Sequence, residues 1–202
     1  HIVVSDQSGR ANILARFREI GLDVGADDGK VSALVETVKL REYDGYAYDG
    51  AEASFELLAR RALGSVPTFF KLARFRVMDE RRWNVRGDLI TESEATVTLE
   101  IDGEQLMTVA SGNGPVNALD GALRKALMPA YPALADMRLV DFKVRILTPQ
   151  AGTEAITRVM IESADDKGER WSTVGVSPNI IDASFEALND AITWKLLKAN
   201  AR

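Results

Sequence analysis

The sequence predicts an α+β fold in which an N-terminal helical linker subdomain precedes a duplicated βββα domain, with two three-stranded antiparallel sheets and two helices. The hydrophobic period changes from about 3.6 to 2 residues after residues 64–67, Gly-Ser-Val-Pro. Residues 108–118 recur as residues 173–183, at an offset of 65, and a long helical pattern follows each copy. Two copies are too few for a solenoid, so we expect two units related by a pseudo-twofold axis.

Three helices are predicted before the domain boundary. The first begins near Arg10, with Ser8 as its N-cap, and ends at Gly21. The second loses its pattern at residues 43–46, Tyr-Asp-Gly-Tyr, which resemble a hinge. The third spans residues 51–63. The chain therefore divides into a linker subdomain, 1–65, and a second domain, 66–202, with repeats at about 68–131 and 136–198.

Helical spacing also predicts which side chains of these three helices are buried. The residues expected to face inward are Ile13, Leu14, Phe17 and Ile20, then Val31, Leu34, Val35 and Val38, then Ala51, Phe55, Leu58 and Ala62. Glu56 and Arg60 are four residues apart in the third helix, so we expect them to form an outward-facing ion pair.

Alternation with a period of two predicts three strands in the first repeat. The residues expected to share one strand face are Ala73, Phe75 and Val77, and then Ala95, Val97, Leu99 and Ile101; Leu106, Thr108 and Ala110 lead into the first long helix. Asp102 and Gly103 suit a two-residue hairpin turn. The polar residues 81–93 are interpreted as a mobile loop. The helix that follows the strands carries Val116, Leu119, Leu123, Ala126 and Leu127 on one face.

The second repeat follows the same scheme. Its predicted strands carry Val140, Phe142, Val144 and Ile146, then Val159 and Ile161, then Trp171 and Thr173. Its helix carries Ile181, Phe185, Leu188, Ile192 and Leu196. Asp165 and Asp166 precede Gly168 and are interpreted as part of a solvated turn.

Composition excludes several classes of function. The 202 residues include one histidine, His1, and no cysteine, which argues against catalytic triads, thiolate chemistry and metal-dependent hydrolysis. No group of acidic residues has the spacing of a metal site, so no metal ligand and no catalytic residue is predicted. The net charge of −5, with basic residues scattered, makes nucleic acid an unfavourable partner. With no apolar run of membrane-spanning length, we expect no membrane association, and the absence of cysteine fits a cytoplasmic location.

The start of each repeat helix is the clearest candidate for a binding site. Gly112, Asn113 and Gly114 precede the first helix, and Ser177 and Asn179 occupy the corresponding place before the second. Glycines allow backbone N–H groups to approach an anion, and a helix N-terminus carries partial positive charge. A well-formed helix start with no ligand is the competing interpretation. Tyr131 and Trp171 are large aromatics near the ends of repeat elements, for which core packing competes with ligand stacking.

Five ordered strings of the sequence carry a family resemblance: residues 5–10 (Ser-Asp-Gln-Ser-Gly-Arg), 50–58 (Gly-Ala-Glu-Ala-Ser-Phe-Glu-Leu-Leu), 112–120 (Gly-Asn-Gly-Pro-Val-Asn-Ala-Leu-Asp), 141–145 and 175–181. Together they resemble the C-terminal region of the 2-isopropylmalate synthase/(R)-citramalate synthase family. The resemblance covers essentially the whole chain, and the residues of these strings are closer to the citramalate synthase branch. It implies a linker subdomain followed by a regulatory and dimerisation domain.

The same resemblance implies a parent enzyme that condenses acetyl-CoA with a 2-oxo acid in a metal-dependent (β/α)₈ barrel. Such a barrel needs about 250 residues, and its pattern is not present. The chain begins with His1, not Met, within a run of β-branched residues. We therefore expect a fragment that is inactive alone. Divalent metal and acetyl-CoA are expected for the barrel and no cofactor for this chain. The implied partners are a second copy, in a homodimer, and the chain's own barrel.

The resemblance further implies an end-product amino acid as feedback inhibitor, isoleucine for a citramalate synthase or leucine for a 2-isopropylmalate synthase. The residues predicted to form a slot for the effector's side chain are Leu106, Leu127, Tyr131, Val144 and Trp171. The residues predicted to offer backbone contacts are Gly112, Asn113, Gly114, Ser177 and Asn179. The alternative is a dimerisation module with no effector site.

Overall fold

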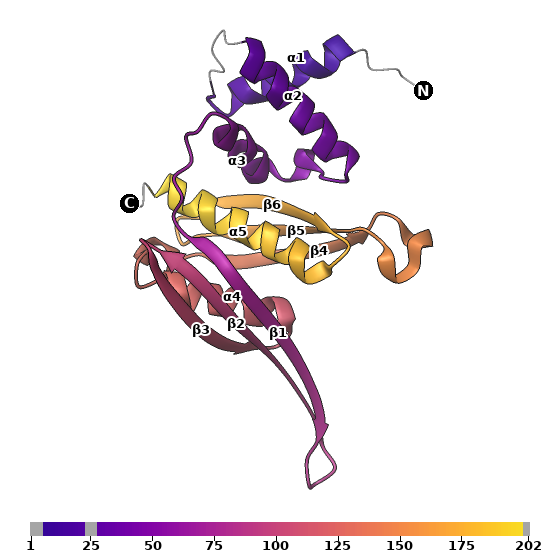
Figure 1. Ribbon diagram of the computed structural model, residues 1–202, viewed down its shortest axis with the longest axis vertical. Coiled ribbons are helices and arrows are strands. Elements are labelled where there is room, and N and C mark those ends of the chain that lie inside the picture. The colour runs from indigo at the N-terminus through magenta and orange to yellow at the C-terminus, as the bar shows by residue number, and fades with distance from the viewer. Residues whose placement is uncertain (1–5, 23–27, 200–202) are drawn as a thin grey trace.

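The chain folds into a helical arm, residues 6–62, which packs on a body of two sheets and two long helices (Figure 1). The computed structural model describes residues 6–22 and 28–199, so His1 lies outside the described residues. The elements of the arm are α1 (Asp6–Glu19), α2 (Asp28–Tyr43), the 3₁₀ turn η1 (Tyr48–Gly50) and α3 (Glu52–Ala62). The elements of the body are β1 (Lys71–Trp83), β2 (Leu89–Ile101), β3 (Glu104–Gly112), α4 (Pro115–Leu127), η2 (Pro132–Leu134), β4 (Arg138–Ile146), η3 (Pro149–Glu154), β5 (Thr157–Ala164), β6 (Arg170–Ser177) and α5 (Ile180–Lys198).

The predicted duplication is confirmed by the topology and by individual contacts. Each repeat forms a three-stranded antiparallel sheet, in the order β1-β2-β3 and β4-β5-β6. In Figure 1, α4 lies behind the first sheet and α5 lies in front of the second. Thr108 donates a hydrogen bond to the carbonyl of Ala122 over 2.8 Å, and Thr173 donates one to the carbonyl of Ala187 over 2.8 Å. The same strand-to-helix hydrogen bond therefore recurs 65 residues later.

The two repeats share one hydrophobic core. Val97 and Leu99 of β2 and Leu119 and Leu123 of α4 are fully buried, as the alternation and helical spacing predict. Their cluster continues into the second repeat through Val159, Ile161, Leu188 and Ile192. Phe75 of β1 stacks on Phe185 of α5, with ring centroids 5.3 Å apart. Neither repeat buries its apolar surface alone, so the body folds as one unit.

One glycine at each strand–helix crossing allows the close approach that these contacts need. In the first repeat the glycine is on the helix, where a Cβ on Gly121 would lie 3.3 Å from the Cβ of Ala110. In the second repeat it is on the strand, where a Cβ on Gly175 would lie 1.9 Å from the carbonyl oxygen of Ala183. The two repeats therefore have the same close strand–helix approach, with the glycine on the helix in the first repeat and on the strand in the second.

The interpretation of residues 81–93 as a mobile loop is wrong. The β1–β2 ladder runs without interruption from Arg74 paired with Thr98 to Trp83 paired with Leu89, and the connecting turn occupies residues 84–88. The ribbon projects beyond the body, at the end opposite the arm (Figure 1). Its polar composition reflects exposure on both faces rather than the absence of a strand. The hairpin turn at Asp102 and Gly103 is confirmed, with φ of 51° and 84°.

A bulge at the same place in both repeats also departs from the expected alternation. The register shifts between Leu72 and Arg74 in β1 and between Leu139 and Asp141 in β4. The extra residues are Ala73 and Val140, which are exposed rather than inward-facing. A bulged residue is not constrained by the ladder, so strict alternation cannot place it.

Three predictions for the arm need correction. Helix α1 begins at Asp6, four residues before the expected start, so Ser8 lies inside the helix and is not its N-cap. Ala62 is exposed, because α3 ends there. Glu56 is only 6% exposed, although it does pair with Arg60. Its carboxylate also binds Lys198 of α5 over 2.9 Å, a partner that local sequence does not reveal.

Helix α3 covers the free edge of β6 and satisfies its outward backbone groups. The N–H of Ser172 donates to the Glu52 carboxylate over 3.0 Å, and the N–H of Val174 donates to the Ser54 hydroxyl over 3.0 Å. An uncovered sheet edge exposes unpaired N–H and C=O groups, so these side chains complete the second sheet. Because α3 contacts both β6 and α5, the domain boundary at residue 65 stays an interpretation.

Asp190 ties α3 to the underlying helix α5. Its carboxylate accepts a hydrogen bond from Ser54 over 2.7 Å and binds the guanidinium of Arg61 over 2.8 Å. Burial raises the pKa of Asp190, against the opposing effects of Arg61 and Ser54. Ser54 is therefore shared between the β6 edge and Asp190, and it is the point where the arm, the sheet and α5 meet.

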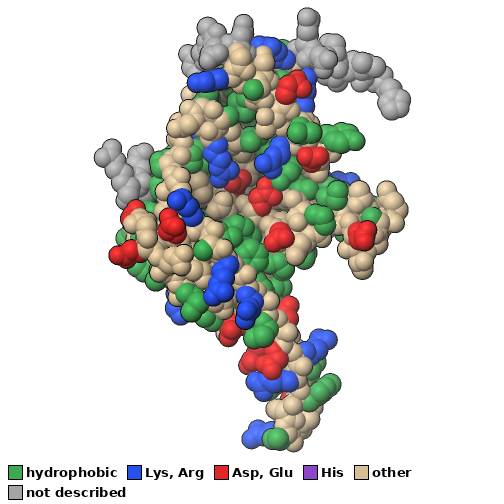
Figure 2. Space-filling model, in the orientation of Figure 1, with side chains coloured by type: hydrophobic (Ala, Val, Ile, Leu, Met, Phe, Trp, Pro, Cys, Tyr) green, Lys and Arg blue, Asp and Glu red, His purple; other side chains and the backbone are tan. Residues whose placement is uncertain are grey.

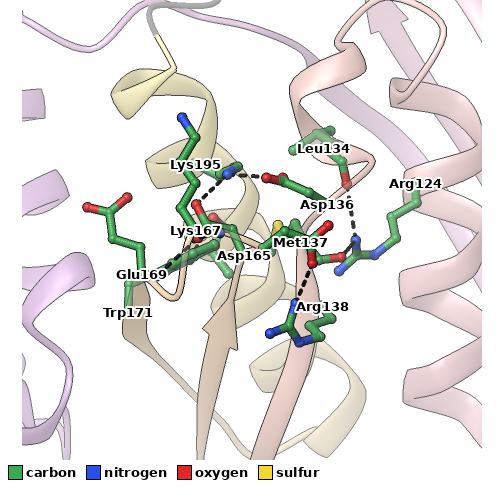
Figure 3. Close-up of polar contacts among 12 residues, drawn as sticks. Arg124, Leu134, Asp136, Met137, Arg138, Asp165, Lys167, Glu169, Trp171 and Lys195 are labelled. Carbon is green, nitrogen blue, oxygen red and sulfur yellow. Dashed lines mark hydrogen bonds and ion pairs between the residues drawn. The ribbon is translucent and has the colours of Figure 1, made fainter.

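The interpretation of Asp165 as part of a solvated turn is also wrong. Asp165 is 1% exposed and binds the ammonium of Lys195 over 2.7 Å (Figure 3). Asp136, in the segment that joins the two repeats, binds the same ammonium over 3.0 Å. The hydrogen bond from Lys195, together with backbone N–H donors of the turn, lowers the pKa of Asp165. One buried lysine thus connects the repeat junction, the β5–β6 turn and α5.

We predict that Lys195→Met destabilises the body. The variant leaves the buried carboxylate of Asp165 and the partly exposed carboxylate of Asp136 without their cation, which costs roughly 3 kcal/mol of unfolding free energy. Urea unfolding followed by circular dichroism measures this loss. Lys167→Met removes an exposed lysine from the same turn and should change the unfolding free energy by less than about 0.5 kcal/mol. Equal effects of the two substitutions would show that the Lys195 ion pairs do not stabilise the body.

We predict that Ser54→Ala loosens the arm before it loosens the body. The variant removes the acceptor of the Val174 N–H and the donor to Asp190, a change that costs about 1–3 kcal/mol. Hydrogen exchange should therefore become faster in α1–α3 and at Val174 while the amides of β2 remain protected. Ser65→Ala, at an exposed serine just beyond α3, is the matched control. Uniformly faster exchange in β2 and the arm would contradict a local role.

Candidate functional site

The start of α4 offers backbone donors that no side chain caps. Gly114 is the N-cap residue, and no side-chain acceptor for the helix's first N–H groups is found among the described residues. The loop before it is tight: a Cβ on Gly112 would lie 2.5 Å from the backbone nitrogen of Ala118. The side chain of Asn117 closes the loop by accepting a hydrogen bond from the N–H of Asn113 over 3.1 Å. A carboxylate at this helix start would meet donors and a favourable dipole.

The start of α5 differs from its counterpart because it is capped from within. The Asn179 side chain accepts hydrogen bonds from the N–H groups of Ile181, over 2.8 Å, and Asp182, over 3.4 Å. The N–H of Asn179 in turn donates to the Ser177 hydroxyl over 3.0 Å. The predicted backbone contacts at Ser177 and Asn179 are thus already engaged in capping. Of the two pseudosymmetric helix starts, the start of α4 is the one without a side-chain cap.

Three of the five residues predicted to form the effector slot lie in the core. Leu127, Tyr131 and Trp171 are 0%, 6% and 1% exposed. The Tyr131 hydroxyl donates to the carbonyl of Phe69 over 2.5 Å, and the Trp171 indole donates to the carbonyl of Ala191 over 3.1 Å. Their polar atoms are therefore satisfied within the chain, as expected for core packing. In this conformation these side chains are sealed from solvent.

The other two slot residues lie on different sheets. Leu106 of β3 is 40% exposed and Val144 of β4 is 42% exposed. The ten predicted effector residues consequently fall into three settings: two helix starts, a buried core and exposed strand positions. A complete slot would need a rearrangement or a surface contributed by another chain.

A cavity of about 700 Å³ lies where the arm meets the second repeat. The arm side of this seam cavity is formed by Arg41 and residues 43–46, the hinge-like segment recognised in the sequence. The body side is formed by Leu147, Thr148, Ile156, Val176, Ser177 and Pro178. Gly45 has a φ of 110°, and a Cβ there would lie 2.2 Å from the Leu147 side chain, so the hinge segment requires glycine.

Glu186 of α5 organises the polar side of the seam cavity. Its carboxylate accepts a hydrogen bond from the Tyr46 hydroxyl over 2.6 Å and from the N–H of Val176, at the β6 edge, over 3.1 Å. Arg41 binds the same carboxylate over 3.4 Å and lies over the Tyr46 ring. Burial and the hydrogen bond to Glu186 raise the pKa of Tyr46, so this phenol stays protonated at neutral pH. Arg158 also donates to the carbonyl of Gly45 over 2.8 Å.

Sequence reasoning did not predict Glu186 and Asp190, although a signal is present. They are four residues apart on one face of a helix that is otherwise largely buried. Acidic residues at helical spacing on a buried face indicate partners from another element. Here the side-chain partners of both carboxylates come from the arm.

Neither a metal site nor a membrane span is found in the part of the chain that the structure describes. Among residues 6–22 and 28–199, no three His, Asp or Glu side chains come together in a way that could hold a metal ion. None of the described helices is long and apolar enough to cross a membrane.

Comparison with known proteins agrees with this architecture. Residues 49–196 match the family described as LeuA allosteric (dimerisation) domain. The chain is 49% identical to the (R)-citramalate synthase of Geobacter sulfurreducens and 48% identical to that of Streptomyces coelicolor, over 98% of its own length in each case. It is 27% identical to the 2-isopropylmalate synthase of Dictyoglomus turgidum over 96% of its length.

The chain spans only part of these relatives: 37%, 36% and 35% of their respective lengths. Its resemblance to the C-terminal region of the 2-isopropylmalate synthase/(R)-citramalate synthase family is confirmed, with the two sheets and two helices in the expected order. The family match covers the end of the arm and nearly all of the body. The chain belongs to the LeuA allosteric (dimerisation) domain family.

Proposed function

We propose that this chain is the linker and feedback-regulatory region of an acetyl-CoA-dependent (R)-citramalate synthase, that it forms a homodimer and that isoleucine is its effector. The observation that carries the proposal is the duplicated βββα body within residues 49–196, the segment that matches an allosteric dimerisation domain. The citramalate branch is favoured by the identities of 49%, 48% and 45% to (R)-citramalate synthases, against 27% to a 2-isopropylmalate synthase over similar coverage.

The catalytic step itself belongs to another part of the proposed protein. Because the chain corresponds to little more than a third of its relatives, the remaining two thirds would hold the barrel, its divalent metal and acetyl-CoA. The described residues contribute no cluster that could hold a metal ion. The chemistry proposed for this chain is thus binding and transmission rather than turnover.

For the effector we propose a binding mode based on the start of α4. The free amino acid's carboxylate would accept hydrogen bonds from the first N–H groups of α4, which have no side-chain cap among the described residues. Leu106 and Val144 are exposed apolar residues on different sheets, so a slot for its side chain would be completed by a second copy of the chain or by a rearrangement. Because Leu127, Tyr131 and Trp171 are buried, they would support the slot from beneath unless the core opens.

Transmission to the barrel would pass through the arm. An allosteric effect requires that the effector bind two states of the arm with different affinity. The hydrogen bonds at Ser54, Asp190 and Glu186 hold the arm in one docked state. Residues 43–46 supply a hinge about which the arm could move to a second state. The seam cavity lies at that segment, so its shape would differ between the two states.

We predict that isoleucine binds the chain in calorimetric titration, while leucine and valine bind more weakly or not at all. Gly114→Val should weaken isoleucine binding by at least about tenfold. Gly114 has an extended backbone, and a Cβ there meets nothing within 4 Å, so the added side chain blocks the helix start without straining the fold.

Asp44→Ala, which alters only an exposed wall of the seam cavity, is the control and should leave isoleucine affinity unchanged. If Asp44→Ala weakens binding and Gly114→Val does not, the effector site lies in the seam cavity. Binding of leucine alone would move the chain to the 2-isopropylmalate branch. No binding to a folded dimer would support a dimerisation module without an effector site.

A further inference from the structure

The outer face of the first sheet, the face that α4 does not cover, has no partner in this chain. Ladder pairs place Arg74, Thr98 and Met107 in one row across this face, and Arg76, Thr96 and Val109 in the next. Met107 and Val109 are 60% and 39% exposed. Two adjoining hollows, of about 280 and 450 Å³, lie over these rows and share Arg74 and Met107 in their walls.

The outer face of the second sheet is partly covered by the arm. Val174 is buried in the arm's hydrophobic cluster, and Met160 and Val176 pack against that cluster. The arm thus covers on the second repeat the face that stays open on the first. The exposed methionines mark this open face of the first sheet as an interaction surface.

Charge is divided along this outer face. Near the body, Arg74 and Arg76 have no ion-pair partner among the described residues. Farther along the β1–β2 ribbon, the ladder pairs Met78 with Glu94 and Glu80 with Glu92. Glu80 and Glu92 share one arginine, Arg82, at 3.3 and 3.4 Å, so this end of the face carries an excess of acid. In Figure 2, basic side chains lie over the lower body and a cluster of acidic side chains follows where the ribbon begins to project, with further basic side chains beside it and toward the tip.

This division suits a second copy of the same face. A homodimer with twofold symmetry uses one surface twice, so that surface must be complementary to itself. If the axis lies between the two faces and perpendicular to the strands, the basic end of each copy meets the acidic end of the other. A face with a single sign of charge could not do this, because every contact would be repulsive.

We propose that the homodimer forms through the outer faces of the first sheets, packed antiparallel, with Arg74 and Arg76 of each copy against Glu80, Glu92 and Glu94 of the other. Met78, Met107 and Val109 form the apolar centre of this interface. The projecting ribbon of one copy lies over the hollows of its partner and is covered in return. An isolated two-stranded ribbon is marginally stable in water, so a partner also accounts for its length. The inference rests on the homodimer of the proposed function and adds its interface.

A charge-swap experiment tests the interface. Variant one carries Arg74→Glu and Arg76→Glu, and variant two carries Glu80→Lys, Glu92→Lys and Glu94→Lys. Each alone places like charges in contact, so its dimer should weaken by about tenfold or more. Mixing the two variants restores opposite charges at every contact, so the mixture should form heterodimers. Native mass spectrometry and sedimentation velocity distinguish homodimers, heterodimers and monomers, and heterodimer formation also shows that both variants are folded.

The matched control is Lys143→Glu with Arg145→Glu, the corresponding strand of the second repeat, which should leave the dimer unchanged. If wild type is dimeric and neither charge-reversed variant weakens the dimer, or if mixing forms no heterodimer, this interface is wrong while the homodimer stands. If wild type is monomeric at high concentration, the homodimer of the proposed function fails as well.

Discussion

The arrangement of the molecule depends on how the free edge of β6 is closed. Three outward N–H groups of this strand are satisfied in turn by Glu52 and Ser54 of the arm and by Glu186 of α5. These hydrogen bonds hold α3 against the sheet. Glu186 also binds Tyr46 and Arg41, and Asp190, four residues further along α5, binds Arg61. Because an open edge would invite unintended pairing, this closure protects the sheet and positions the arm at once. The seam cavity lies where the hinge segment is held over the β6 end in this way.

Much of the fold follows from the sequence because its signals are local. The alternation around Val97, the helical spacing around Leu123 and the Asp102–Gly103 turn each depend on neighbours a few residues apart, and each is confirmed. The duplication can be recognised in the sequence because the two copies keep Thr108 and Thr173 at an offset of 65 residues. Each of these threonines makes the same hydrogen bond to its helix. A β-bulge lies beyond such patterns, since the residue it inserts has no ladder partner and follows no period.

The buried charges could not be predicted in the same way. Glu56 binds Lys198 across 142 residues of sequence, and Asp165 binds Lys195 across 30. A charge at a plausible surface position is interpreted as solvated unless its distant partner is known, which is why the sequence predicts an exposed position for Glu56 and Asp165. The effector slot stays a prediction for a related reason. Sequence identifies Tyr131 and Trp171 as large aromatics near the ends of repeat elements, whose helix starts could bind an anion. Whether these side chains face a cavity or the core is decided by packing between the repeats.

Divergence between the two copies is as informative as their similarity. The second repeat has a capped helix start, an edge closed by the arm and an outer face partly covered by it. The first repeat has a helix start without a side-chain cap and an open outer face with exposed methionines. Under the proposed function, the first repeat would therefore bind partners from outside, and the second repeat would hold the arm. Under the proposed function, a signal between the two would cross the shared core, where Phe75 of β1 stacks on Phe185, the residue before Glu186. A small displacement of β1 on binding would thus reach the carboxylate that holds Tyr46 and the β6 edge together.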